Sequence, residues 1–301
     1  MRRRIAVSLL ALVAPAALAV AACAREKPGE AGRSSVSASL PVSGTAGAMR
    51  AWDDSLGNFI VTPSIETGAP TLFARDTSLS AAFDVELFSH EALTVRATFR
   101  PGASVSGCAW KRTATLGMPA DEPAPVVWSL ALAPGIATPL AIDLVSELLP
   151  RDSSDLVTRI HRLVSALPDD SVSAPFRGLP VVVRDAWRFS REDGSYVAVA
   201  VATRALNLES NPRAEVVTLI AEPDSAAGQR AWRTVFARRV AGPEDRVEGS
   251  DLLAAIRLSG DQTAVVLVRE SEGGAQVDVV ERTTGGAWRV RWSSASLPCF
   301  R

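Results

Sequence analysis

The sequence predicts a mainly β protein of the α+β class: antiparallel β-meanders with a small helical pair in the middle and a C-terminal pair of four-stranded, propeller-blade-like units. Three observations carry this prediction. Short apolar runs separated by turn formers fill residues 50–135, and apolar residues at helical spacing occupy 136–170. The tripeptide Ala-Trp-Arg then recurs in two similar segments, 184–241 and 249–297.

The N-terminus combines a cationic start at Arg2–Arg4, an apolar run over Ile5–Val20 and small residues before Cys23. This pattern resembles a bacterial lipoprotein signal peptide, with residues 1–22 removed and Cys23 acylated. The apolar run is shorter than the roughly 20 residues that a spanning helix needs. The alternative is an ordinary secretory signal cut after Ala22.

Acylation of Cys23, for example with palmitate, implies that membrane lipid is a partner and that the protein is anchored in the cell envelope, facing the periplasm or the cell surface. Ala24 in place of an acidic residue favours the outer membrane by resemblance to known sorting. Residues 23–49 are rich in Gly, Ser, Ala and Pro and are expected to form a flexible tether. Without the leader the net charge is mildly acidic, which gives no support for a nucleic-acid partner.

Cys108 and Cys299 are the remaining cysteines, and an exported protein meets an oxidising environment. A disulfide between them would close a long loop and is the candidate that we favour. The alternative is two separately buried thiols, because sequence alone does not place their Cα atoms within bonding range.

In the N-terminal β region the predicted strands are "NFIVTP", "PTLFAR", "FDVELF", "LTVRATF", "CAWKRTATL" and "PVVWSLAL". The run "LTVRATF" alternates apolar and polar residues, which is typical of a sheet with one solvated face. Breaks are expected at Pro101–Gly102 and at Met118–Pro119.

Two helices are predicted next. Thr138 as the cap, Pro139 at the first helical position and Pro150 as the stop outline a short one. Residues 151–168 then place apolar side chains on one stripe, which makes this the clearer amphipathic helix. His161 lies at the margin of that stripe and is expected to be a solvated surface residue.

The C-terminal region, 171–301, is interpreted as two units of four strands, each closed by a strand that begins with the tripeptide. Alternation places Trp288, Val290 and Trp292 on one face and Arg289 and Arg291 on the other. The same alternation places Trp232, Thr234 and Phe236 on the face opposite Arg233. The expected role of each Trp is to fill the core, while each Arg points to solvent or to a cross-strand acid. The alternative is a recognition surface of outward aromatic rings and guanidinium groups, made by Trp187, Trp232, Trp288, Arg233 and Arg289.

The segments "EDGSYVAVAV" and "SGDQTAVVLV" resemble the FG-GAP or VCBS-like β-repeats of exported bacterial proteins, in which an acidic turn leads into an apolar strand. The resemblance covers roughly residues 184–297. Family turns carry several carboxylates that can hold calcium, whereas these turns have Asp261 alone and Glu192–Asp193. We therefore expect neither a metal nor a cofactor.

Catalytic motifs are absent, so we predict no catalytic residues and a non-catalytic binding or scaffold role whose ligand is unknown, with another envelope protein or a glycan as partner. The two histidines, His90 and His161, lack the spacing of a zinc site. The alternative function is a carboxylate-dependent hydrolase of envelope glycans or esters. Its nominal acids are Asp169–Asp170 and Asp152 with Asp155, and turns and helix caps explain both pairs more simply than catalysis does.

Overall fold

The computed structural model describes residues 56–57, 59–63, 70–74, 81–105, 108–118, 127–168, 170–207, 210–224, 231–247, 249–271, 274–294 and 297–298. All of them belong to the unit Leu40–Arg301. They form three antiparallel sheets, one α-helix and short 3-10 turns, which confirms the mainly β class.

Sheet 1 has the strand order β2-β1-β6-β3-β4-β5. Its strands are β1 (Phe59–Pro63), β2 (Pro70–Ala74), β3 (Phe83–Phe88), β4 (Thr94–Val105), β5 (Cys108–Gly117) and β6 (Leu130–Leu132). The sheet curls until its two edge strands, β2 and β5, lie close to each other. The predicted break at Pro101–Gly102 is wrong: β4 continues through it, and the register of β4 with β5 shifts there instead. Pro101 lacks an N–H and Gly102 a side chain, which suits a bulge as well as a turn.

Sheet 2 has the order β12-β11-β10-β9-β8, and sheet 3 has the order β16-β15-β14-β13-β7. In sheet 2 the strands are β8 (Ile142–Leu144), β9 (Val182–Ser190), β10 (Tyr196–Leu206), β11 (Arg213–Pro223) and β12 (Trp232–Pro243). In sheet 3 they are β7 (Ala137–Leu140), β13 (Asp251–Leu258), β14 (Gln262–Ser271), β15 (Gly274–Arg282) and β16 (Trp288–Ser293), and β17 (Leu297–Pro298) also pairs with β15. Sheets 2 and 3 are therefore each a meander of four consecutive strands, as predicted. Each has one extra edge strand, β8 in sheet 2 and β7 in sheet 3.

The prediction of a helical pair is wrong. The segment expected to form the first helix is mostly extended and supplies these two edge strands. Residues 130–144 supply β6 to sheet 1, β7 to sheet 3 and β8 to sheet 2 in succession. Only the short 3-10 turn η2 (Val145–Glu147) follows before the helix. Hydrogen bonds to two open sheet edges outweigh a weak local preference for helix, and Pro139 is acceptable on an edge strand.

The second predicted helix is present as α1 (Pro150–Ser165), with Pro150 in its first turn. Leu156, Ile160 and Val164 are buried on one face of it, against small and apolar residues of sheet 2. His161 is exposed, as predicted. Two further 3-10 turns, η3 (Ala174–Phe176) and η4 (Glu244–Arg246), lie in the connections.

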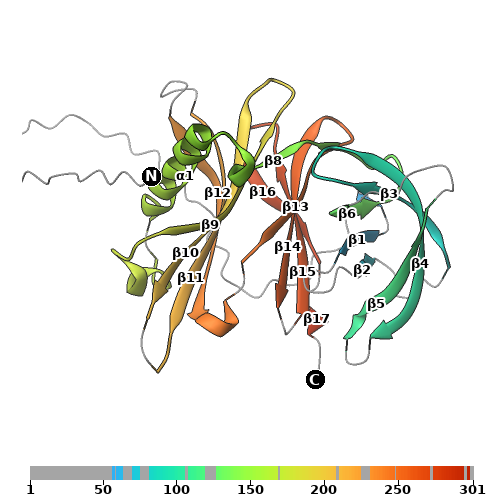
Figure 1. Ribbon diagram of the computed structural model, residues 1–301, viewed down its shortest axis with the longest axis horizontal. Helices are drawn as coiled ribbons and strands as arrows, with labels where there is room; N and C mark the ends of the chain where they lie inside the picture. Colours follow the sequence, from blue (N-terminus) through green and yellow to red (C-terminus); the bar gives the residue numbers. More distant parts are fainter. Residues whose placement is uncertain are drawn as a thin grey trace, which may run out of the picture. The chain divides into compact units, whose positions relative to one another are not determined.

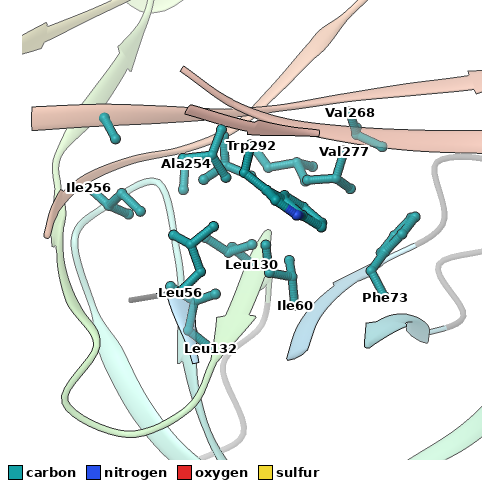
Figure 2. Packing of buried hydrophobic residues seen from close by; sticks show 14 of the residues in the cluster. Leu56, Ile60, Phe73, Leu130, Leu132, Ala254, Ile256, Val268, Val277 and Trp292 are labelled. Carbon is teal, nitrogen blue, oxygen red and sulfur yellow. The ribbon is translucent and has the colours of Figure 1, made fainter. Parts of the chain in front are cut away.

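The layers stack in the order α1, sheet 2, sheet 3, sheet 1 (Figure 1). Between sheets 2 and 3, apolar side chains from both meanders form one cluster that includes Trp187 and Trp288. Between sheets 3 and 1, Trp292, Val268 and Val277 face Leu130 and Ile60 (Figure 2). A fourth cluster fills the curl of sheet 1, where the rings of Phe59, Phe83 and Phe99 are in contact. Each interior sheet is thus buried on both faces.

His90 lies where the three sheets are joined. Its Nε2 donates a hydrogen bond to Leu253 O at 3.0 Å, and its own carbonyl accepts from Ile142 N at 2.8 Å. Leu253 falls at the bulge of β13, where the ladder to β14 skips a residue, so its carbonyl is available to the imidazole. His90 therefore connects a turn of sheet 1 to sheets 2 and 3, which is a structural role.

Candidate functional site: a guanidinium cluster at the hairpin ends of two sheets

The recurring tripeptide has one structural meaning at three of its four occurrences: its basic residue stands directly opposite an acid on the neighbouring strand. Arg188 pairs in register with Asp143, Arg233 with Glu222, and Arg289 with Glu281. The corresponding nitrogen to oxygen distances are 2.9, 3.9 and 2.9 Å. The fourth occurrence, the Lys variant at Ala109–Trp110–Lys111, is described in its backbone only. Directly opposed opposite charges stabilise antiparallel pairs.

The tryptophan of each closing strand is the first residue of that strand, Trp232 in β12 and Trp288 in β16. The expectation that Trp288, Val290 and Trp292 share one face is wrong for Trp292. It packs toward sheet 1, whereas Trp288 and Val290 pack toward sheet 2. A register shift between Val279 and Val280 leaves Arg291 as the extra residue of β16. A bulge of this kind turns the following side chains to the other face.

A register shift in the equivalent place separates the aromatic residues of β12. It lies between Ile220 and Ala221, and Val235 is the extra residue. Trp232 accordingly packs with the cluster beneath α1, whereas Phe236 packs toward sheet 3. The two units share the bulge as well as the tripeptide, so the internal repeat extends to backbone irregularities.

Glu222, on β11, is the centre of a charged group that joins the two units, and its side chain is 4% exposed. Its Oε1 accepts from Arg282 Nε at 2.7 Å and from Trp288 Nε1 at 2.9 Å, both from sheet 3. Arg191 Nη1 lies 3.8 Å from Oε1, and Arg233 Nη2 lies 3.9 Å from Oε2. We call Arg191, Arg233 and Arg282, grouped about Glu222, the Glu222 cluster.

The turn between β9 and β10 holds Arg191 in place. Arg191 Nε donates to Ser195 Oγ at 2.8 Å, and its Nη2 lies 2.9 Å from Asp193 Oδ2. Asp193 accepts from the hydroxyl and the backbone N–H of Ser195, and these hydrogen bonds, the hydroxyl foremost, lower the pKa of Asp193 below 3.8. Glu192 of the same turn forms an ion pair with Arg257 of β13. The turn is therefore tied to sheet 3 by charge.

Glu281 repeats the arrangement within sheet 3 alone. Its Oε1 accepts from Arg289 Nε and Nη2 at 3.0 and 2.9 Å, and its Oε2 accepts from Arg291 Nη1 at 2.9 Å. Both arginines lie on β16. The two other buried carboxylates of the described body also face arginines: Glu215 faces Arg204 and Arg239, and Asp278 faces Arg238 and Arg269.

The predicted recognition residues do not form one surface. Trp187 and Trp288 are buried between sheets 2 and 3, and Trp232 is partly buried on the other face of sheet 2. Arg233 and Arg289 have exposed side chains, at 53% and 68%. Sequence reasoning missed Glu222, Arg191 and Arg282. An alignment of the two units on the tripeptide would have found Glu222, because an acid ends the apolar run of the third strand in both.

Several predicted features lie outside the described residues: Cys23 with its leader and tether, Asp169, and Cys299. Of Cys108 only the backbone is described, as the first residue of β5. Strand β17 ends one residue before Cys299 and lies beside β5, so the disulfide between Cys108 and Cys299 stays a prediction.

Two of the acids named for the hydrolase alternative have ordinary structural partners, and Asp152 lies in the first turn of α1, whose N-cap is Leu149. Asp170 accepts from the backbone N–H of Ser173 at 2.8 Å, which is the largest of the effects that lower its pKa, and so closes a turn. Asp155 pairs with Arg159 one helical turn later. Within the described part of the chain no group of three or more His, Cys, Asp or Glu residues is arranged to hold a metal ion.

Among the described helices, none has both the length and the apolar character needed to cross a bilayer. Comparisons with protein-family models, with curated proteins and with solved structures found no match for this chain.

Proposed function

We propose that this protein is an envelope lipoprotein, anchored through acylated Cys23, whose stacked β body binds or holds another envelope component without catalysing a reaction. The anchor rests on the order of cationic start, apolar run and small residues that ends at Cys23. The composition of residues 23–49 suits a tether between that anchor and the body.

The observation that carries the non-catalytic part is the use of the buried carboxylates. Two or more arginines of other strands or turns face each of the four buried carboxylates, Glu215, Glu222, Asp278 and Glu281. A carboxylate that transfers a proton or attacks a substrate must face that substrate. Acids held by guanidinium groups instead fix strands to one another within a sheet or, at Glu222 and Asp278, fix sheets 2 and 3 to each other. This use of the acids favours a scaffold over the hydrolase alternative.

Substitution of Cys23 tests the anchor. Cys23→Ser removes the thiol that would be acylated, so the protein is expected to lose palmitate label and either to leave the membrane fraction or to remain unprocessed. The measurement is labelling with radioactive palmitate and fractionation of the cells. Cys108→Ser is the matched control, since it removes a cysteine of the body and should keep full labelling. A Cys23→Ser protein that labels and fractionates like the wild type would contradict the proposal.

A further inference from the structure

The Glu222 cluster brings three guanidinium groups from three separate strands or turns to one place. Arg191 comes from the β9–β10 turn, Arg233 from β12 and Arg282 from the end of β15. We propose that these three arginines form a binding site for a phosphate-type oxyanion. The inference rests on the proposed binding function and gives that function a ligand class.

The first argument is the balance of charge. Among the described residues, Glu222 and Asp193 are the carboxylates that the three arginines face, and the adjoining Glu192–Arg257 pair adds one charge of each sign. These arginines and carboxylates together therefore carry one more positive charge than negative charges. A guanidinium group cannot be deprotonated in a protein, so this excess persists at any physiological pH. An anion from outside would balance it.

The second argument is the geometry around Glu222. Arg282 and Trp288 already donate hydrogen bonds to its Oε1. Arg191 and Arg233 stand 3.8 and 3.9 Å from the carboxylate, within the range of an ion pair but longer than a hydrogen bond. Each guanidinium has five N–H donors in a planar fork. The arrangement thus offers donors that Glu222 does not engage at short range.

The third argument is preorganisation. Arg191 is held by Ser195 and Asp193, and Arg282 by Glu222. Gly286, with φ of 79°, approaches Arg282 so closely that a Cβ there would lie 3.2 Å from Nη2. The β15–β16 turn thus limits the movement of that guanidinium. Donors already held in position lose little conformational entropy when a ligand binds.

The shape of the donor set selects the ligand. The three guanidinium groups surround the Glu222 carboxylate from three backbone segments, and each has more N–H donors than that carboxylate engages. A further acceptor with three oxygens, such as a phosphate, suits such a set of donors better than a planar carboxylate with two. Arg233 has an exposed side chain and supplies the entry side, whereas Arg191 and Arg282 are 15% and 25% exposed. A phosphate group could come from a soluble phosphate ester or from the headgroup of an anionic lipid.

The test is equilibrium dialysis of the purified full-length mature protein, in neutral detergent, against radiolabelled inorganic phosphate. We expect saturable binding that weakens with added salt, and a roughly tenfold rise in Kd for Arg233→Gln from the loss of one charge-assisted contact. Arg233→Lys keeps the charge without the fork and should fall between the two. Arg233 is exposed, so these variants are expected to fold.

The matched control is Arg96→Gln. Arg96 also faces a cross-strand acid, Glu86, at 3.7 Å with an exposed side chain, but in sheet 1. It removes the same charge and should leave Kd within twofold of the wild type. Absence of saturable phosphate binding, equal binding by Arg233→Gln, or an equal loss in Arg96→Gln would overturn the site. None of these results bears on acylation of Cys23, which the labelling experiment tests separately.

Vesicles identify the source of the phosphate. Phosphatidylcholine vesicles with and without phosphatidylglycerol take up an acyl anchor alike, so extra binding to the second kind reports the headgroup. Extra binding that Arg233→Gln loses assigns the site to a lipid headgroup. Equal binding to both kinds, together with saturable binding of inorganic phosphate, assigns it to a soluble phosphate ester.

Discussion

The two β units place the same pair, an arginine opposite a glutamate, at the same register, yet the surroundings of the two pairs differ. Glu281 accepts from Arg289 and Arg291, which lie on the next strand of its own sheet. Glu222 lies between sheets and accepts from Arg282 and Trp288 of sheet 3 in addition to facing Arg233. The same local pattern thus holds two strands of one sheet together at Glu281. At Glu222 it also holds sheet 2 against sheet 3.

The neighbouring layer explains the difference. The face of sheet 2 that carries Glu222 packs on sheet 3, so the residues at the start of β16 lie within reach of the carboxylate. The equivalent face of sheet 3 packs on sheet 1, which has another architecture and does not repeat the tripeptide strand at that place. The sheet that packs on each arginine–glutamate pair therefore determines which further residues that pair contacts.

The largest expected effect separates the two tryptophans. Trp288→Ala removes a buried ring and its hydrogen bond to Glu222, and should lower the free energy of unfolding by about 3–5 kcal/mol. Trp232→Ala removes a partly buried ring and should cost about 1–2 kcal/mol. Urea unfolding of both variants measures the difference. If Trp288→Ala unfolds at the same urea concentration as the wild type, Trp288 is not the core residue described above.

The next effect separates the two glutamates. Glu222→Gln leaves three arginines facing a neutral group at a buried position and should cost about 2 kcal/mol of unfolding free energy. Glu281→Gln should cost about 1 kcal/mol, because water can solvate the exposed Arg289. The same urea titration measures both. Equal costs would mean that the contact between sheets adds nothing to the pair.

The smallest effect is a pH dependence at the turn beside Glu222. Hydrogen bonds from Ser195 lower the pKa of Asp193 below the ordinary value of 3.8. A lowered pKa in the folded state adds stability that is present above the unfolded value and is lost as the pH falls through the folded value.

The comparison for this effect is Asp193→Asn against the wild type, with the free energy of unfolding measured from neutral pH down to about pH 3. We expect the wild type to be more stable at neutral pH, and the difference to shrink below about pH 4. A difference that stays constant over this range would show that the charge of Asp193 does not contribute.

Much of the secondary structure follows from local pattern. The strands of the N-terminal region, the amphipathic helix after Pro150 and the eight strands of the two units were predictable because alternation and helical spacing act over a few residues. Residues 137–144 were not, because helix-like caps at Thr138 and Pro139 carry no information about open edges of distant sheets. Only part of the candidate site was predictable from sequence. The tripeptide indicated Arg233 and Trp288, but no pattern in the neighbouring residues indicated Arg191.

The sequence by itself determined that this is a mainly β chain with an internal repeat, and that the arginine of each Ala-Trp-Arg tripeptide points to solvent or to a cross-strand acid. Those properties depend on side-chain periodicity along one strand and on its immediate neighbour. Only the tertiary structure decided that bulges turn Trp292 and Phe236 away from Trp288 and Trp232. It also decided that Arg282, 60 residues further along the chain, meets Glu222. Stacking of whole sheets brings such residues together, and no pattern within a single strand encodes it.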